Sequence, residues 1–456
     1  MKNKVASTFA LLTGFVSKGH PRSVKTKKNI LASLVIKGIS IAIGLAFVPL
    51  TINYVNSTRY GIWLVLSSII AWFGYFDIGF GNGLKNKFAE SIAKKDYETA
   101  RIYLSTTYAI LTGLAVVATI IFLCVNPFIN WARVLNAPPE MGAELRRLSL
   151  IIFIFFWLQF VFQLITTILA ANQDSAKAAF FNLLGNILAL IIIFILTKTT
   201  EGNLIYLGCV LSITPVIVMI GSSLWFYNRE YKIYSPSFKH INFSYTKSLM
   251  GLGVTFFVIQ ICALVLFQTD NIVITQLFSP EEVTVFNIAY KLFSVITIAF
   301  SIVITPLWSA FTEAYTNQDF GWIRTTLSKL RKFWVVLVLI TTAMLIASPL
   351  LFKLWMGDKV KIPFSLSLAL SFYIIVFSWQ TIHVYFLNGI GKIRLQLYLV
   401  IISGLINIPI AIYLGKAIGL AGVTLSNAVL FVVMGIIFSI QVEKLINNKA
   451  TGIWAK

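Results

Sequence analysis

Apolar runs of about 20 residues follow one another along nearly the whole chain, separated by short polar segments. A run of this length is what an α-helix needs to cross the hydrocarbon core of a bilayer. The pattern therefore predicts an all-α membrane protein, and an even number of spans puts both chain ends on one side. The predicted spans are twelve, near residues 29–52, 61–81, 102–126, 148–171, 178–197, 204–226, 249–278, 283–307, 333–353, 362–388, 395–414 and 417–441.

A polar segment between two of these runs occurs twice. Residues 88–101 read FAESIAKKDYETAR and residues 311–324 read FTEAYTNQDFGWIR, with a constant offset of 223 in a chain of 456 residues. The matched positions are Phe88 with Phe311, Glu90 with Glu313, Asp96 with Asp319, Tyr97 with Phe320 and Arg101 with Arg324. Chance similarity of two polar loops is the alternative, but a repeat at nearly half the chain length favours an internal duplication.

The duplication predicts two bundles of six helices, related by a pseudo-twofold axis along the membrane normal, a layout that transporters use. Each junction then lies between the second and third span of its bundle. The expected boundaries are a basic tail at 1–28, a first bundle at 29–226, an interfacial linker at 227–248, a second bundle at 249–441 and a tail at 442–456.

Composition supports this class, and charge orients it. The chain is 58% hydrophobic and 12% charged, with a net charge of +21. Of its 37 Lys and Arg residues, 26 fall in segments on the side of the chain ends and 9 on the far side. This bias predicts cytoplasmic termini, junctions and linker, and it explains the basic charge by anionic lipid, so that nucleic acid is not an expected partner.

Several function classes lack their signatures. There is no phosphate-binding glycine loop, and no His, Cys and carboxylate cluster has metal-ligand spacing. The longest far-side loop, residues 127–147, is too short to fold as a domain. We therefore expect no enzyme activity, no cofactor and no metal.

Four ionisable residues lie within predicted spans, where charge is costly and is either paired or functional. Lys37 and Asp77 are expected ~10 Å and ~7 Å from one membrane face, and Asp270 and Lys291 each ~13 Å from the other. These depths allow two ion pairs of purely structural role. Alternatively, both lysines face a central cleft and bind a diphosphate, while the two acids hold the lysines or carry a coupling proton.

The junction charges have a simpler interpretation. Glu90, Arg101, Glu313 and Arg324 lie in amphipathic segments outside the spans. Charges in such places usually cap helices or pair locally. We expect a structural role for this repeated set.

Two related stretches point to a known family. They read FVPLTINYVNSTRYGIWLVLSSIIAWFGYFDIGFGNGLKNKFAES in the first half and TDNIVITQLFSPEEVTVFNIAYKLF in the second. The chain resembles the polysaccharide-transporter, or oligosaccharide flippase, branch of the multidrug/oligosaccharidyl-lipid/polysaccharide (MOP) exporter superfamily. Residues 56–61 resemble the family's polar turn into Tyr-Gly, and residues 279–282 are its counterpart. The second copy departs from the family by having Thr284 where Gly is frequent.

The resemblance implies a MATE-like exporter fold and a flippase in the bacterial inner membrane. Such a protein moves undecaprenyl-diphosphate-linked oligosaccharide, an O-antigen or other surface-polysaccharide unit of lipopolysaccharide biosynthesis, to the periplasmic leaflet by alternating access. A proton or sodium gradient is expected to drive the transport. A polysaccharide polymerase and a chain-length regulator are expected partners. The family's cationic cavity would correspond here to Lys37 and Lys291, with Arg59 at the outer mouth, but the resemblance implies no specific coupling residue.

Two other functions fit the sequence less well. A cation or drug antiporter of the same fold would need a cavity of net acidic character, whereas lysines and acids are balanced within these spans. A membrane polymerase or ligase of glycans usually needs a sizeable periplasmic loop with catalytic charges, which this chain lacks.

Overall fold

The computed structural model describes residues 21–77, 80–172, 174–250 and 269–455. Every regular element in these ranges is helical, which confirms the predicted all-α class. Most of the expected N-terminal tail lies outside the described residues. Its last part, from Pro21, already belongs to the first long helix.

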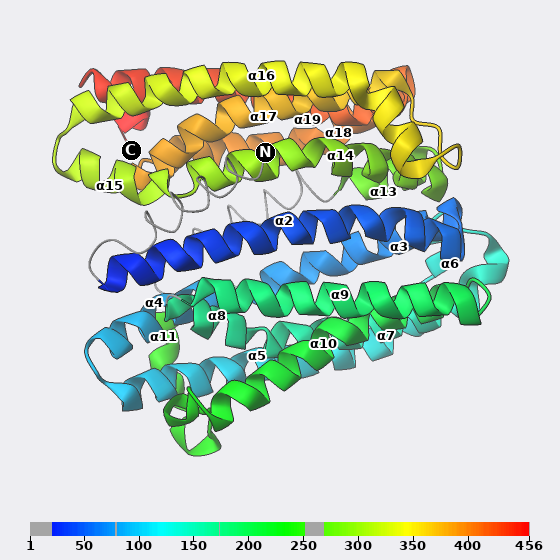
Figure 1. Ribbon diagram of the computed structural model, residues 1–456, viewed down its shortest axis with the longest axis horizontal. Coiled ribbons are helices and arrows are strands. Elements are labelled where there is room, and N and C mark those ends of the chain that lie inside the picture. Colours follow the sequence, from blue (N-terminus) through cyan, green and yellow to red (C-terminus); the bar gives the residue numbers. More distant parts are fainter. Residues whose placement is uncertain (1–20, 78–79, 173, 251–268, 456) are drawn as a thin grey trace, which may run out of the picture.

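The helices form two lobes that lie one above the other in Figure 1. The N-lobe contains α2 (Pro21–Val55), α3 (Ser57–Ala71), α4 (Phe80–Ala93), α5 (Tyr97–Val125), α6 (Trp131–Val134), α7 (Gly142–Phe162), α8 (Leu164–Ala171), α9 (Ser175–Thr199), α10 (Leu204–Asn228) and α11 (Thr246–Met250). The C-lobe contains α13 (Asp270–Leu277), α14 (Pro280–Ile304), α15 (Leu307–Thr316), α16 (Phe320–Met356), α17 (Phe364–Ile390), α18 (Arg394–Ile418) and α19 (Leu420–Ile446).

Ten helices within the described ranges are long and apolar enough to cross a membrane. The two remaining predicted spans are those near 61–81 and 249–278. The first is α3, which ends at Ala71 and passes into the 3-10 turn Trp72–Asp77, so the helix breaks before the predicted end. The second lies mostly outside the described residues, and α13 is its described end.

The polar junctions at 88–101 and 311–324 have the same local structure. Asp96 and Asp319 cap α5 and α16, each accepting a hydrogen bond from the backbone N–H three residues later. The residue before each cap, Lys95 or Gln318, has a positive φ of 59° or 57°. Phe88 and Phe311, the first residues of the two junctions, are fully buried. Sequence positions 223 apart therefore adopt one conformation twice.

A second repeated feature is the turn that precedes the second long helix of each lobe. Asn56 caps α3 by accepting from the N–H of Arg59, and Ser279 caps α14 by accepting from the N–H of Glu282. Both pairs are again related by 223 residues. Because the side chains of Asn56 and Ser279 satisfy backbone N–H groups in the first turn of the next helix, they determine where α3 and α14 begin.

The two turns meet each other across the lobes. The Thr284 hydroxyl donates to the carbonyl oxygen of Ser57 at 2.7 Å, and the Ser57 hydroxyl donates to the Glu281 carboxylate at 3.0 Å. At Gly61, a Cβ atom would lie 1.7 Å from the carbonyl oxygen of Pro280, so only glycine allows this approach. Gly61 and Thr284 are themselves 223 residues apart, so α3 and α14 cross at equivalent positions of the two lobes.

Further hydrogen bonds join the lobes at this same end, called here the turn end (residues 56–61 and 279–284). Asn136 Nδ2 donates to the carbonyl oxygen of Thr275 at 2.8 Å, and Gln276 Nε2 donates to that of Val134 at 2.7 Å. In Figure 1, α3, α6 and α13 gather at this end.

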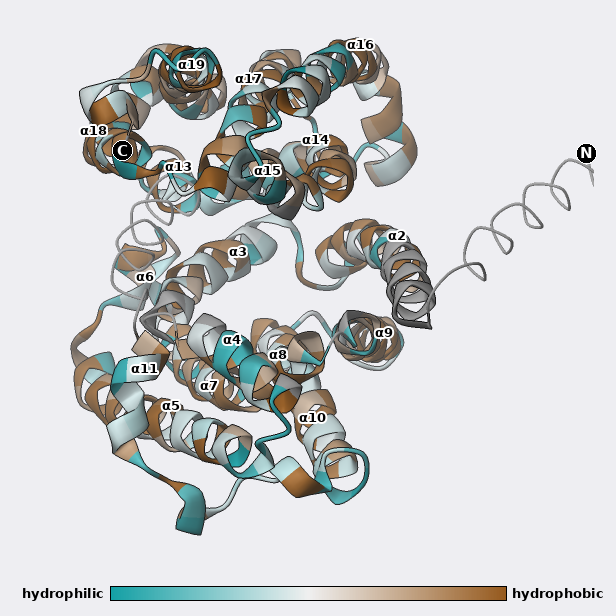
Figure 2. Ribbon diagram, turned by 90° about the vertical axis from the view of Figure 1, so that its left-hand side faces the viewer, coloured by the Kyte–Doolittle hydropathy of each residue, from teal (hydrophilic) through white to brown (hydrophobic). Residues whose placement is uncertain are grey.

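The opposite end carries both junctions and is called the junction end. No hydrogen bond between described residues joins α4, α5 or α8 to the C-lobe helices there. Figure 2, viewed from this end, shows α13–α19 on one side and the N-lobe helices on the other, with α2 and α3 on the edge of the N-lobe that faces the C-lobe. The lobes are thus tied together at one end of the molecule.

Candidate functional site

Lys37 and Lys291, for which the sequence suggests a place in a central cleft, are both lining residues of one cavity between the lobes. Lys37 comes from α2 in the N-lobe and Lys291 from α14 in the C-lobe. The cavity has a volume of about 320 Å³, and its other lining residues are Ser40, Ile41, Gly44, Leu45, Ser294, Val295 and Ile298.

Gly44 of α2 lies directly beside the Lys291 side chain. A Cβ atom there would lie 3.5 Å from Cε of Lys291. None of the described residues that line this cavity is acidic. Two ammonium groups without a carboxylate among the lining residues create a site that favours an anion.

The ion pair that residue depth allowed between Asp270 and Lys291 is not formed, so the structural alternative does not hold for these two residues. Asp270 begins α13, and both of its carboxylate oxygens accept from Nδ2 of Asn427 in α19, at 3.1 Å and 2.8 Å. Residue depth does not specify how a helix is rotated about its axis. In the structure, Asp270 faces the C-lobe cavity and Lys291 faces α2. Asp77 ends the 3-10 turn that follows α3, and the expected Lys37–Asp77 pair involves a side chain outside the described part of the structure.

Asp270 belongs to a buried network of amides. Asn407 of α18 donates through Nδ2 to Oδ1 of Asn427 at 2.8 Å, and the Thr269 hydroxyl lies 3.5 Å from Oδ1 of Asn407. Asn407 is fully buried, and Asn427 is nearly so. The amide groups hold the carboxylate in place from one side.

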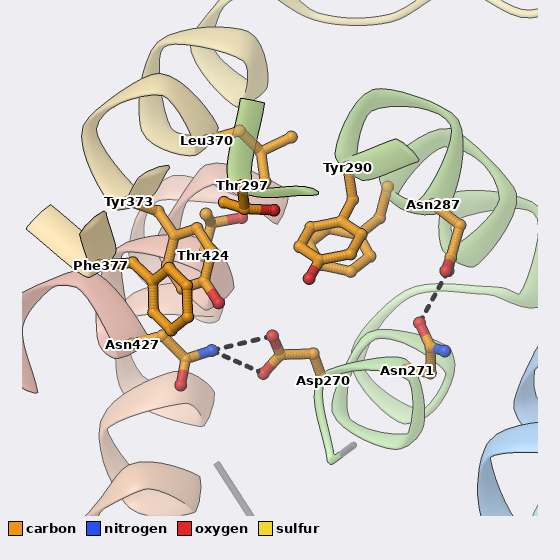
Figure 3. Close-up of a pocket in the computed structure, with 11 residues that line it drawn as sticks. Asp270, Asn271, Asn287, Tyr290, Thr297, Leu370, Tyr373, Phe377, Thr424 and Asn427 are labelled. Carbon is orange, nitrogen blue, oxygen red and sulfur yellow. Dashed lines mark hydrogen bonds between the residues drawn. The ribbon is translucent and has the colours of Figure 1, made fainter. Parts of the chain in front are cut away.

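On the other side Asp270 faces a cavity of about 380 Å³ inside the C-lobe (Figure 3). The aromatic rings of Tyr290 and Tyr373 point into it from α14 and α17. The remaining lining residues are Asn271, Phe286, Asn287, Thr297, Leu370, Phe377, Thr424 and Asn427. A carboxylate in a cavity lined by amide and hydroxyl oxygens is an arrangement suited to a small cation or a proton.

This cavity is linked to the N-lobe through two of its amides. Asn287 Nδ2 donates to Oδ1 of Asn271 at 2.7 Å, and Nδ2 of Asn271 donates to the hydroxyl of Ser68 in α3, also at 2.7 Å. Asp270 is thus the chain neighbour of Asn271, which makes a hydrogen bond between the lobes.

Arg59 lies away from both cavities. It is in the first turn of α3, and its guanidinium donates through Nη1 to the carbonyl oxygen of Gly202 at 2.9 Å. This contact ties α3 to the loop before α10 within the N-lobe.

Among the junction residues, Glu90 pairs locally, whereas the two arginines bond to distant parts of the chain. Glu90 forms ion pairs with Lys94 at 2.7 Å and Lys87 at 2.9 Å, and the hydrogen bonds and charges of these two lysines lower the pKa of Glu90 to about 2. Arg101 donates through Nε to the carbonyl oxygen of Ser235 at 2.7 Å.

The second copy repeats the arginine contact. Arg324 donates through Nη2 to the carbonyl oxygen of Ile446 at 3.3 Å and to Oδ1 of Asn447 at 3.2 Å. Arg324 thus binds the end of α19 and the residue after it, and Arg101 binds the chain that follows α10. Glu313 is exposed on α15, and no described ion pair repeats the one at Glu90.

Sequence reasoning missed the residues that surround Asp270. Asn427, Asn271 and Asn287 are amides within apolar runs, and such residues are expected to bond across helices in a membrane. Their presence was a usable signal, but their convergence on Asp270 depends on the packing of α13, α14 and α19.

Comparison with known proteins agrees with this architecture. The chain is 22% identical to the "Putative O-antigen export protein" of Yersinia pseudotuberculosis over 361 residues, which cover 78% of this chain and 81% of that protein. It superposes on the inward-facing conformation of a multidrug resistance MATE family transporter of the MOP superfamily with a TM-score of 0.75, at 16% identity, over 92% of this chain and 98% of the other. The outward-facing conformation of such a transporter gives a TM-score of 0.63, at 16% identity, over 95% and 98%.

A family model described as "Polysaccharide biosynthesis protein" matches residues 26–311, which is more than half of the chain. The match begins in α2 and includes both turns, the lysine cavity and the first junction. Together with the MATE fold, it identifies this multi-pass membrane protein as a member of the polysaccharide biosynthesis protein family.

Proposed function

We propose that the protein is a flippase for a lipid-linked oligosaccharide, moving an undecaprenyl-diphosphate-linked surface-polysaccharide unit such as O-antigen from the cytoplasmic to the periplasmic leaflet. The transporter family and the fold support a membrane transporter of polysaccharide precursors. The chain would act by binding and reorientation, without breaking or forming bonds in its substrate.

The observation that carries the proposal is the lysine cavity. Lys37 and Lys291 come from different lobes and line one space between them. A diphosphate carries at least two negative charges, and lysine is a common phosphate ligand. A binding site shared by two lobes can be opened toward either side by rocking one lobe against the other.

The arrangement of the lobes supports loading from the junction end. Hydrogen bonds join the lobes at the turn end, and the higher TM-score belongs to an inward-facing transporter. Because the excess of basic residues favours a cytoplasmic junction end, this conformation corresponds to one that accepts substrate from the cytoplasmic leaflet. The inner membrane and cytoplasmic termini are part of this proposal.

We assign ion coupling to Asp270. Its carboxylate is held by Asn427 and faces the C-lobe cavity. Binding of a proton or a sodium ion there would neutralise a buried charge, which would otherwise be costly. Through Asn271 and Ser68 that change would reach the contact between the lobes. Asp77 remains the second candidate for coupling, and a polymerase and a chain-length regulator remain expected partners.

The test replaces the two lysines. Lys37→Ala and Lys291→Ala should each reduce surface polysaccharide in cells that depend on this protein and should leave lipid-linked oligosaccharide accumulated in the cytoplasmic leaflet. Lys198→Ala, at the exposed end of α9, is the matched control and should export normally. Normal export by both cavity variants at wild-type protein level would overturn the anion-site assignment.

A cation or drug antiporter is the second candidate, and one observation favours it: the buried Asp270 in a cavity lined by aromatic rings. Such a protein should transport an organic cation against a proton or sodium gradient in proteoliposomes. Cation transport that survives removal of both Lys37 and Lys291 would favour this alternative over the flippase.

A further inference from the structure

A third cavity lies in the N-lobe, away from the space between the lobes. It is a groove of about 720 Å³ between α5 and α10, covered by the linker of residues 227–248. Its lining residues are Ser105, Tyr108, Ala109, Thr112, Phe162, Ile220, Ser223, Leu224, Tyr227, Asn228, Ser235, Pro236, Ser237, Phe238 and Ile241. None of them lines the lysine cavity or the Asp270 cavity.

The cover of this groove is fixed to α5. Ser235 accepts from the Arg101 guanidinium at 2.7 Å through its carbonyl oxygen. Ser237 then donates its backbone N–H to the hydroxyl of Ser105 at 3.1 Å, and farther along the linker Asn242 donates its N–H to the hydroxyl of Thr106 at 3.0 Å. Three contacts along one helix hold the linker in a defined path, so the groove is part of the folded structure.

The groove has apolar walls and one polar end. Ala109, Phe162, Ile220 and Leu224 supply apolar surface along α5, α7 and α10. At the polar end the hydroxyls of Tyr108 and Tyr227 are 3.1 Å apart. Pockets for small ligands are mostly apolar with few polar groups, and they span roughly 300–1,000 Å³.

The linker that covers the groove carries positive charge and exposed aromatic side chains. It contains Arg229, Lys232, Lys239 and Lys247. Its one acid, Glu230, is already bonded to Lys177 at 2.7 Å. Exposed aromatic rings beside basic residues are typical of a segment at the membrane interface.

Phe238 makes the link between the charge and the groove. It lines the groove, yet 93% of its surface is exposed in the isolated chain, and Lys239 follows it directly. Phe243 and Ile233 of the same linker are 64% and 52% exposed. Exposed apolar side chains beside basic residues suit a segment that lies at a lipid surface.

We propose that this groove binds one anionic membrane phospholipid, with an acyl chain between α5 and α10 and the phosphate beside Lys232 and Lys239 of the linker. An acyl chain gains little hydrophobic free energy on leaving the bilayer for an apolar groove, because both surroundings are apolar. Selection therefore rests on the headgroup charge, which the linker complements. The inference is independent of the transported substrate.

The experiment uses the full-length protein in vesicles of phosphatidylcholine that contain a few per cent of phosphatidylglycerol carrying a photoactivatable acyl chain. Labelled peptides are mapped by mass spectrometry. The wild type should be labelled mainly on α5, α10 and the linker, and unlabelled phosphatidylglycerol should compete far better than phosphatidylcholine.

Two variants probe the two parts of the site. Ala109→Trp fills the groove and should reduce labelling of α5 and α10 at least fivefold, whereas Val117→Trp, on the exposed lipid-facing side of the same helix, should leave it unchanged. Lys232→Gln and Lys239→Gln, both on the exposed linker, should each weaken competition by phosphatidylglycerol about fivefold. Lys416→Gln, at the turn end, is their control.

Three results would overturn the proposal. One is equal competition by phosphatidylcholine. Another is groove labelling that neither Ala109→Trp nor the lysine variants change. The third is displacement by undecaprenyl phosphate at much lower concentration than by phosphatidylglycerol, which would make the occupant a polyprenyl lipid instead. Should Ala109→Trp fail to fold, the exposed lysine variants still decide the outcome.

Discussion

Replacing Gly61 by alanine tests how the lobes close at the turn end. The added Cβ would lie 1.7 Å from the carbonyl oxygen of Pro280, 2.5 Å from its carbonyl carbon and 3.1 Å from the Thr284 hydroxyl. The first two atoms belong to backbone and cannot rotate away. An ordinary van der Waals contact begins at 3.4 Å. Because the helices are already closely packed at this point, α3 and α14 must move apart to reach it.

The size of the effect follows from where the strain acts. Overfilling a well-packed contact costs about 1–3 kcal/mol, and here it burdens only the conformation in which the two turns touch. The hydrogen bond from Thr284 to Ser57 would be weakened at the same time. A penalty of this size changes the ratio of two conformations by roughly 5-fold to 150-fold.

Spin labels on the two lobes at the turn end would measure this shift as a longer distance in double electron–electron resonance. Export of surface polysaccharide should fall in parallel, because a transporter held in one conformation cannot complete its cycle. Gly113→Ala in α5 is the control: no neighbouring atom lies within 4 Å of the new Cβ, and alanine favours a helix over glycine by about 1 kcal/mol. A Gly61→Ala protein with the wild-type distance distribution would refute the reasoning.

Three further outcomes are expected. Asp270→Asn preserves size and removes the charge that faces Asn427, so gradient-driven transport in proteoliposomes should fall at least tenfold at unchanged protein yield; retained gradient dependence would remove Asp270 from coupling. Arg101→Ala and Arg324→Ala should each lower the thermal unfolding midpoint in detergent, because each loses a charged hydrogen bond, to Ser235 after α10 or to Ile446 at the end of α19, worth about 1.5–3 kcal/mol; no change in either would make these contacts incidental. Glu90, with its pKa lowered to about 2 by Lys94 and Lys87, stabilises the fold above its unfolded value of 4.5 and loses that contribution as pH falls toward 2, so Glu90→Gln should lower the midpoint slightly at pH 7 and at low salt but not near pH 2; a difference that persists in acid would contradict the linkage.

The fold was largely predictable because the bilayer constrains it. Length and hydropathy of the apolar runs determine most spans, and the junction repeat revealed the two-part arrangement. The predicted end of the second span was wrong because residues Trp72–Asp77 form a 3-10 turn. Hydropathy does not reveal such a turn. The start of α16 at Phe320, well before the predicted 333, follows from the Asp319 cap, a polar signal outside the apolar run.

The candidate site was predictable in part for a related reason. The cost of charge in apolar surroundings singles out Lys37, Lys291 and Asp270, and two of these share a cavity. Residue depth, however, does not specify which way a helix faces, so it allowed an Asp270–Lys291 pair that the structure does not form. Asn427 reaches it from a helix 157 residues later, a contact that depends on tertiary packing.

Cross-linking the lobes at the turn end tests the central claim most directly, since the account requires these turns to separate in each cycle. Ser57 and Glu281 hydrogen-bond across the lobes at 3.0 Å, so cysteines at both positions, in a chain whose three native cysteines are replaced, can be joined by a short, reducible thiol linker. Transport of lipid-linked oligosaccharide should stop when the link forms and return when it is reduced. Undiminished transport by fully cross-linked protein would contradict the account.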